Sequence, residues 1–85
     1  MNLSIETITN GPWKQNCYVV ADLDTRKSFI VDPGSEGAKI QKRIDDGGFE
    51  PVAIVNTHGH FDHVGAADFL MKTYGIPFYL SCADA

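Results

Sequence analysis

One stretch of the sequence restricts the possible folds more than any other. The run Val52–Asn56 is apolar on both faces, which is typical of a strand buried inside a sheet. All three histidines of the chain follow it closely, at His58, His60 and His63, and Asp62 lies among them. Because open α/β sheets place their sites at the carboxyl ends of strands, this arrangement predicts a sheet with a functional site after a buried strand.

The rest of the chain supplies strands first and then alternating helices and strands. Apolar and β-branched runs between turn residues predict the strands, and apolar residues spaced by three or four predict the helices. The first expected elements are strands at Leu3–Ile8, Asn16–Asp22 and Ser28–Val31. A helix follows, with Ser35 as its N-cap, Glu36 in its first turn and Gly47 and Gly48 at its end. After the buried strand come a helix from Val64 to Tyr74 and a strand at Ile76–Leu80. This order predicts an α+β or α/β fold whose mixed sheet carries its helices on one face and leaves the other face in need of cover.

Composition and charge exclude several classes of protein. With 85 residues the chain forms one domain at most, and its formal net charge of -4 offers no basic surface for nucleic acid or an anionic membrane. No apolar run is long enough to span a bilayer, and the start of the chain lacks the pattern of a signal peptide. We therefore expect a cytoplasmic protein that binds neither nucleic acid nor membrane, with Cys17 and Cys82 as small buried apolar residues.

The spacing of the histidine segment suits a metal ion. In an extended chain the rings of His58 and His60 project to the same side, and Asp62 and His63 come where the chain turns into the next helix. Imidazole nitrogens and carboxylate oxygens together suit zinc, and iron or manganese as well. Two plainer interpretations remain open: Asp62 as the N-cap of the following helix, and Asp32 as a turn residue before a proline and a glycine.

At these residues the sequence resembles the metallo-β-lactamase superfamily. The family's H-x-H-x-D-H signature after a buried strand is matched by the segment from His58 to His63. The stretches Asn16–Tyr18 and Val31–Gly34 agree in position as well, and they look most like the hydroxyacylglutathione hydrolase (glyoxalase II-like) branch. The resemblance covers essentially the whole chain, and it implies the first half of an αββα sandwich.

The resemblance also implies roles for individual residues. His58 and His60 would help to hold a first metal ion, and Asp62 and His63 a second, with Asp62 counted as catalytic; zinc, as one or two ions in a complete site, is the expected metal. In the family the metal deprotonates a bound water, and the hydroxide attacks a small-molecule substrate, here expected to be a thioester or an ester. Asp32 would orient a ligand histidine or the motif loop.

Part of the family's ligand set has no counterpart in this sequence. The family uses further histidines and a bridging aspartate downstream of the motif, whereas this chain has no histidine outside residues 58–63. We therefore expect residues 1–85 to be the N-terminal portion of a metallo-β-lactamase-fold domain, with weak metal binding and little activity by itself. Two alternatives stay open: an iron-dependent oxidoreductase or sulfur dioxygenase of the same fold, and a non-catalytic fragment that self-associates through the uncovered sheet face.

Overall fold

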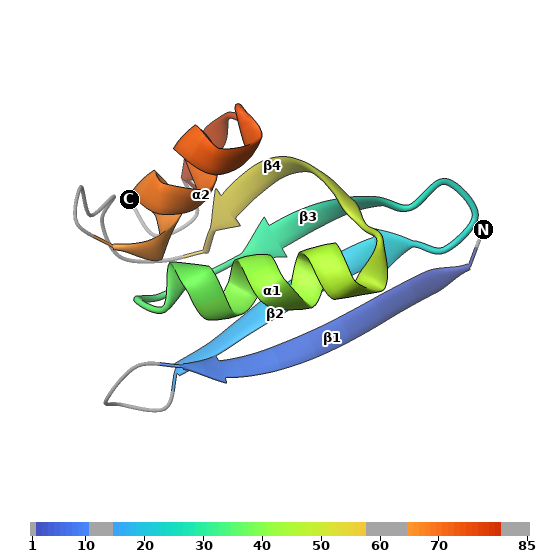
Figure 1. Ribbon diagram of the computed structural model, residues 1–85, viewed down its shortest axis with the longest axis horizontal. Coiled ribbons are helices and arrows are strands. Elements are labelled where there is room, and N and C mark those ends of the chain that lie inside the picture. The colour runs from blue at the N-terminus through green and yellow to red at the C-terminus, as the bar shows by residue number, and fades with distance from the viewer. Residues whose placement is uncertain (1, 11–14, 58–64, 81–85) are drawn as a thin grey trace.

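The computed structural model describes residues 2–10, 15–57 and 65–80 of the chain. Across these ranges the chain forms five strands and two helices (Figure 1). The elements are β1 (Leu3–Asn10), β2 (Gln15–Asp22), β3 (Lys27–Val31), α1 (Gly37–Gly47), β4 (Glu50–Asn56), α2 (Ala66–Tyr74) and β5 (Phe78–Leu80). The predicted order of elements is confirmed, although β5 is shorter than predicted. Neither helix in these ranges is long and apolar enough to cross a membrane.

The strands form one mixed sheet in the order β1-β2-β3-β4-β5. β1, β2 and β3 pair antiparallel, whereas β3 with β4 and β4 with β5 pair parallel and are joined through α1 and α2. Both of these crossovers step across the sheet in the same direction, and crossovers between parallel strands are right-handed. The two helices therefore lie on the same face of the sheet, as predicted, and share one core with it (Figure 1).

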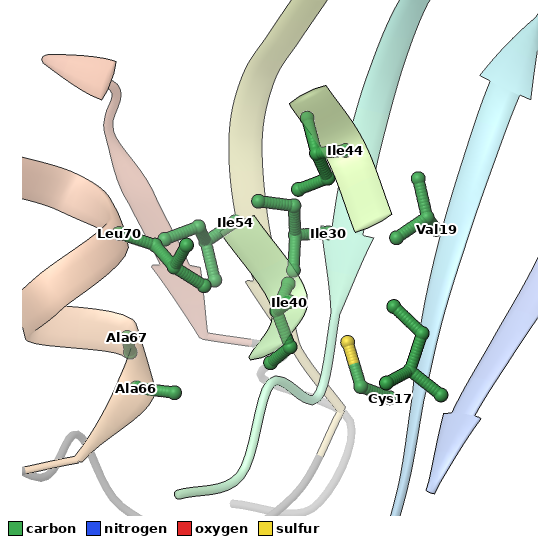
Figure 2. Packing of buried hydrophobic residues seen from close by; sticks show 10 residues of the cluster. Cys17, Val19, Ile30, Ile40, Ile44, Ile54, Ala66, Ala67 and Leu70 are labelled. Atoms are coloured by element: carbon green, nitrogen blue, oxygen red, sulfur yellow. The ribbon is translucent and has the colours of Figure 1, made fainter. Parts of the chain in front are cut away.

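The core lies between the helices and this face of the sheet. Val19 of β2 pairs with Ile30 of β3, which pairs with Ile54 of β4, so the three side chains lie in one row. Ile40 and Ile44 of α1 pack over this row (Figure 2), because a spacing of four places both side chains on one side of a helix. All five are at most 1% exposed. A contiguous apolar cluster therefore fixes α1 on the sheet.

The start of α1 differs from the prediction. α1 begins at Gly37 and its N-cap is Glu36, so the prediction of Ser35 as N-cap and of Glu36 in the first turn is wrong. A Cβ at Gly37 would lie 2.6 Å from Cδ2 of Phe69, which shows how closely α2 approaches this end of α1. The N-cap residue Glu36 makes no capping hydrogen bond with its side chain, and the helix begins where Gly37 packs closely against Phe69. The predicted end is confirmed, with Gly48 as a left-handed C-cap (φ 68°).

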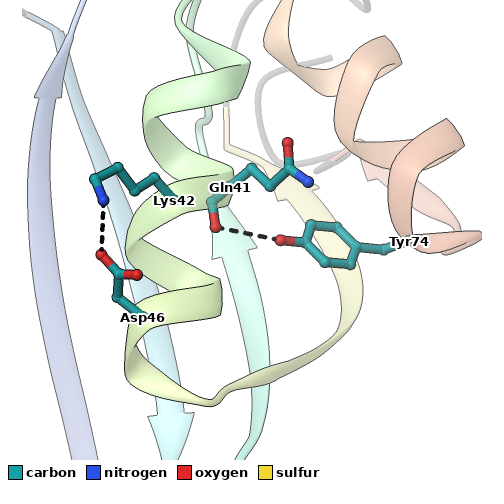
Figure 3. A network of polar contacts seen from close by, with 4 residues as sticks. All are labelled: Gln41, Lys42, Asp46 and Tyr74. Carbon is teal, nitrogen blue, oxygen red and sulfur yellow. Dashed lines mark hydrogen bonds and ion pairs between the residues drawn. The ribbon is translucent and has the colours of Figure 1, made fainter.

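A polar contact joins the last residue of α2 to the other end of α1. The Tyr74 hydroxyl donates a hydrogen bond to Oδ1 of Asp45 at 2.8 Å, and it lies 3.5 Å from the main-chain oxygen of Gln41 (Figure 3). Together with the contact between Gly37 and Phe69, this bond holds α2 to α1 near both ends of α1.

The opposite face of the sheet carries a second set of apolar side chains. Residues that alternate with the core positions point to this face, and the strand register places Ile5, Val20 and Phe29 side by side. Tyr79 of β5 pairs with Val55 of β4 in a neighbouring row. Ile5, Phe29 and Tyr79 are 66%, 47% and 58% exposed, and no described element covers them. The structure therefore has the open face that the sequence predicted, while self-association through it stays a prediction.

We expect copies of the chain to associate through this face as the concentration rises, and we expect charged side chains placed on the face to weaken this association. Replacing Ile5 and Phe29 together by Lys places like charges where two copies would meet, and this should weaken association about tenfold or more. Sedimentation velocity over a concentration series measures it. Replacing Thr25 and Ala38, which are exposed elsewhere, by Lys is the control with equal charge. A wild-type chain that stays monomeric at every concentration would contradict the prediction.

Candidate metal centre

The histidine segment begins at the edge of the sheet where the parallel strands end. Because β3 and β4 are parallel, the turn after β3 and the residues after β4 leave the sheet on the same side. The N–H of Asp32 donates to the main-chain oxygen of Val55 at 3.0 Å, which extends the pairing of the two strands by one step. The strand pairing thereby brings Asp32 to Thr57, which is 25 positions away in the sequence.

Both carboxylate oxygens of Asp32 accept hydrogen bonds from Thr57. The main-chain N–H of Thr57 donates to Oδ1 at 2.7 Å, and its hydroxyl donates to Oδ2 at 2.6 Å. Hydrogen bonds to an ionised carboxylate are shorter and stronger than those between neutral groups. Two such bonds to one residue fix the direction of the chain as well as its position. Thr57 immediately precedes His58, so Asp32 orients the chain where the predicted ligands begin.

The turn that presents this carboxylate has a left-handed backbone. Asp32 has a φ of 51° and Gly34 a φ of 75°, and Pro33 between them is buried. Glycine adopts this conformation freely, and aspartate tolerates it better than most residues do. A left-handed aspartate still costs free energy, so its retention in a structure points to a gain elsewhere, here the two bonds to Thr57. The two interpretations of Asp32 are thus compatible, because one residue forms the turn and holds the neighbouring strand.

The same turn also contacts the far side of the histidine segment. The N–H of Ala66, the first residue of α2, donates to the main-chain oxygen of Gly34 at 3.0 Å. The N-cap of α2 is Gly65, so the interpretation of Asp62 as the N-cap is wrong. The first N–H groups of a helix have no partner inside the helix. The Gly34 oxygen supplies a partner for one of them.

The predicted metal ligands themselves lie outside the described residues. They are His58, His60, Asp62 and His63, and their assignment stays a prediction. Within the ranges that the structure describes, no three His, Cys, Asp or Glu side chains gather into a metal site. Of the predicted site residues the structure therefore describes Asp32, which it places directly against the start of the segment.

Sequence analysis assigns no role to two contributors to this arrangement. Thr57 offers a signal in retrospect, because a threonine directly before the motif presents both an N–H and a hydroxyl to a carboxylate. The oxygen of Gly34 offers none, because every residue carries a main-chain carbonyl.

A buried thiol lies near Asp32. Cys17 of β2 is fully buried and free, as predicted for this cysteine; Cys82 lies outside the described residues. Burial, and to a smaller extent the negative charge of Asp32, raises the pKa of the Cys17 thiol from its ordinary value to about 12. A thiol that stays protonated at neutral pH acts as a packed apolar group, and not as a nucleophile or metal ligand.

Comparison with known proteins shows which family the chain belongs to. A model of the metallo-beta-lactamase superfamily matches residues 10–81, which include the Asp32 turn and the whole histidine segment. The chain belongs to the metallo-beta-lactamase superfamily. The solved structure of BLEG-1, a B3 metallo-beta-lactamase, is similar to it. That structure matches 95% of this chain with a TM-score of 0.83 and 34% sequence identity. The predicted fold class is therefore confirmed.

Curated relatives within the superfamily carry more than one name. The probable metallo-hydrolase YqgX of Bacillus subtilis is 44% identical over 70 residues, or 82% of this chain. The hydroxyacylglutathione hydrolase GloC of Haemophilus influenzae is 35% identical over 77 residues, or 91% of this chain. This chain spans 32% of YqgX, 36% of GloC and 38% of BLEG-1, about a third of each. These matches show the superfamily and do not single out one branch of it.

Removing the contacts between Asp32 and Thr57 should destabilise the chain. Thr57→Val removes one hydrogen bond and should lower the free energy of unfolding by about 1 kcal/mol. Asp32→Ala removes both bonds and leaves alanine in a left-handed conformation, so we expect a loss of about 2–3 kcal/mol. Asp32→Asn, which tolerates that conformation, should cost less. Urea unfolding monitored by circular dichroism measures all three. Equal stability of Asp32→Ala and wild type would contradict this interpretation.

Stability should also fall in alkaline solution. The folded state raises the pKa of Cys17 from 9.0 to about 12, and burial, followed by a hydrogen bond to Asp45, raises that of Tyr74 above its ordinary value of 10.0. Above pH 9 the unfolded chain loses protons that the folded chain retains, so the contribution of Cys17 is complete below about pH 9 and is lost as pH rises toward about 12. Thermal melts from pH 8 to 11 should show a smaller decline for Cys17→Ala than for wild type. Parallel declines would refute the assignment.

Proposed function

We propose that this chain carries the first part of the metal site of a metal-dependent hydrolase. The observation that carries the proposal is the pair of hydrogen bonds from Thr57 to Asp32, immediately before a segment with three histidines and an aspartate. A left-handed turn that fixes the start of this segment is well suited to orient metal ligands. The superfamily match across the same residues supports it.

The donor set of the segment fits a divalent metal ion. We assign His58 and His60 to a first ion, and Asp62 and His63 to a second. Histidine nitrogens and carboxylate oxygens are usual zinc ligands, and we propose zinc as the metal; the same donors also bind iron and manganese. A catalytic zinc commonly has three protein ligands and one open position, so two donors for each ion predict weak binding by this chain alone.

We propose thioester or ester hydrolysis as the reaction. A bound metal ion would supply Lewis acidity and lower the pKa of a coordinated water toward neutrality. Asp32 contributes by holding Thr57, which sets the direction in which the ligand segment leaves β4. The name of the relative GloC, a hydroxyacylglutathione hydrolase, supports a thioester substrate and a glyoxalase II-like branch. The name of YqgX, a probable metallo-hydrolase, supports hydrolysis without a substrate.

The metal content of the purified 85-residue chain tests the proposal. We expect the chain to retain only part of its zinc, less than one ion per chain, after brief dialysis against metal-free buffer, as measured by elemental mass spectrometry, because two donors for each ion bind it weakly. The double variant His58→Ala/His60→Ala should lose at least about tenfold in zinc affinity, because two of the donors are removed. Asp46→Ala, which removes an exposed acid on α1, is the control and should bind like wild type.

Each other outcome favours a different function. Retained iron with visible absorbance would favour an iron-dependent oxidoreductase of the same fold. No retained metal, together with concentration-dependent association, would favour a non-catalytic self-associating chain. Full zinc occupancy in the double histidine variant would contradict the ligand assignment. Release of thiol from a thioester substrate by the zinc-loaded chain then tests the reaction itself, and we expect slow turnover.

A further inference from the structure

One short turn contacts the chain on both sides of the histidine segment. Upstream, the side chain of Asp32 accepts two hydrogen bonds from Thr57. Downstream, the main-chain oxygen of Gly34 accepts a hydrogen bond from the N–H of Ala66. Thr57 directly precedes positions 58–64, and Ala66 follows them after Gly65. The same three-residue turn therefore binds the end of β4 and the start of α2.

The length of the turn limits the distance between these two flanks. Two residues of chain span at most about 7 Å, so the Cα atoms of Asp32 and Gly34, whose groups accept the bonds, lie within that distance of each other. A free flexible chain of nine steps, as from Thr57 to Ala66, would have a typical end-to-end distance of about 17 Å. The hydrogen bonds thus remove much of the freedom that the flanks would otherwise have.

The turn is itself firmly held. The N–H of Asp32 is bonded to the main-chain oxygen of Val55, and the buried ring of Pro33 fixes one backbone angle between the two accepting residues. On the other side, Phe69 of α2 packs against Gly37, five residues beyond Asp32. The end of β4 and the start of α2 are therefore both positioned by contacts with the turn at the end of β3.

We propose that the Asp32–Pro33–Gly34 turn is a two-point brace for the histidine segment, in which Thr57 and Gly34 are positioning residues alongside Asp32. Closing a loop costs conformational entropy, and a brace that has already closed the flanks lowers the cost that metal binding must overcome. The inference rests on the proposed metal site. It adds that the two contacts work together: once either flank is released, the other contact loses most of its effect on metal affinity.

The downstream contact can be removed with little change to the helix. Ala66 is the first residue of α2, a position where proline is favoured, and Gly65 before it is extended (φ -91°, ψ -176°), as a residue before proline prefers. Ala66→Pro therefore deletes the N–H that donates to Gly34 while leaving the helix start intact. Ala66→Val is the matched control, because it adds the same number of heavy atoms at this buried position and keeps the N–H.

Zinc affinity, measured by chelator competition on the full 85-residue chain, is the first readout. Relative to Ala66→Val, we expect Ala66→Pro to weaken zinc binding about three- to tenfold, and Thr57→Val to weaken it by a similar factor relative to wild type. The combined variant should weaken binding by clearly less than the product of the two factors. Equal affinity of Ala66→Pro and Ala66→Val, or effects that multiply, would overturn the two-point brace. Thermal melts establish that each variant is folded.

A second readout keeps the brace separate from the metal. Hydrogen exchange at the Thr57 amide, without added metal, should be about threefold faster or more in Ala66→Pro than in Ala66→Val, because the downstream flank is released. If the wild-type chain binds no zinc, the proposed function fails and exchange alone decides: faster exchange supports the brace as a structural device, and unchanged exchange overturns it. If zinc binds equally in all variants, the metal site stands and the brace fails.

Discussion

The parallel pairing of β3 with β4 is the contact on which the rest of the structure depends. Parallel neighbours cannot be joined by a tight turn, so the chain must cross the sheet through α1. The crossover buries Ile40 and Ile44 on the sheet and fixes its covered face. It also brings the ends of two strands to one edge, where Asp32 meets Thr57. Core and candidate site are therefore two results of the same strand pairing.

Much of this architecture could be predicted from local patterns. The alternation in β2 and β3, the spacing of Ile40 and Ile44, and the glycines after each helix all indicate their elements directly. The start of α1 could not be predicted in this way. Ser35 has the right chemistry for an N-cap, but the helix begins where Gly37 meets Phe69, a residue from the other helix. Contacts between distant parts of the chain decided that boundary, and a local pattern does not contain them.

The candidate site shows the same division. A cluster of three histidines and an aspartate is a pattern of residue types, so sequence analysis singles it out, although the structure does not describe those side chains. The family resemblance assigns a role to Asp32, whereas its partner Thr57 is recognised in the sequence only as the residue before the motif. The meeting of these two residues depends on strand register, because they are distant in sequence and adjacent only once β3 and β4 are aligned. Register is a property of the folded sheet.

The two sides of the histidine segment are held by different kinds of group, and this affects how each can change during evolution. The Asp32 side chain is chemically particular, so few substitutions at that position would keep both bonds to Thr57. The Gly34 oxygen belongs to the backbone and meets the N–H of Ala66, which every residue except proline possesses. Position 66 is thus free to vary in side chain as far as the bond is concerned, whereas position 34 is restricted by its left-handed conformation. Related chains could share the downstream contact while differing in the side chain at position 66.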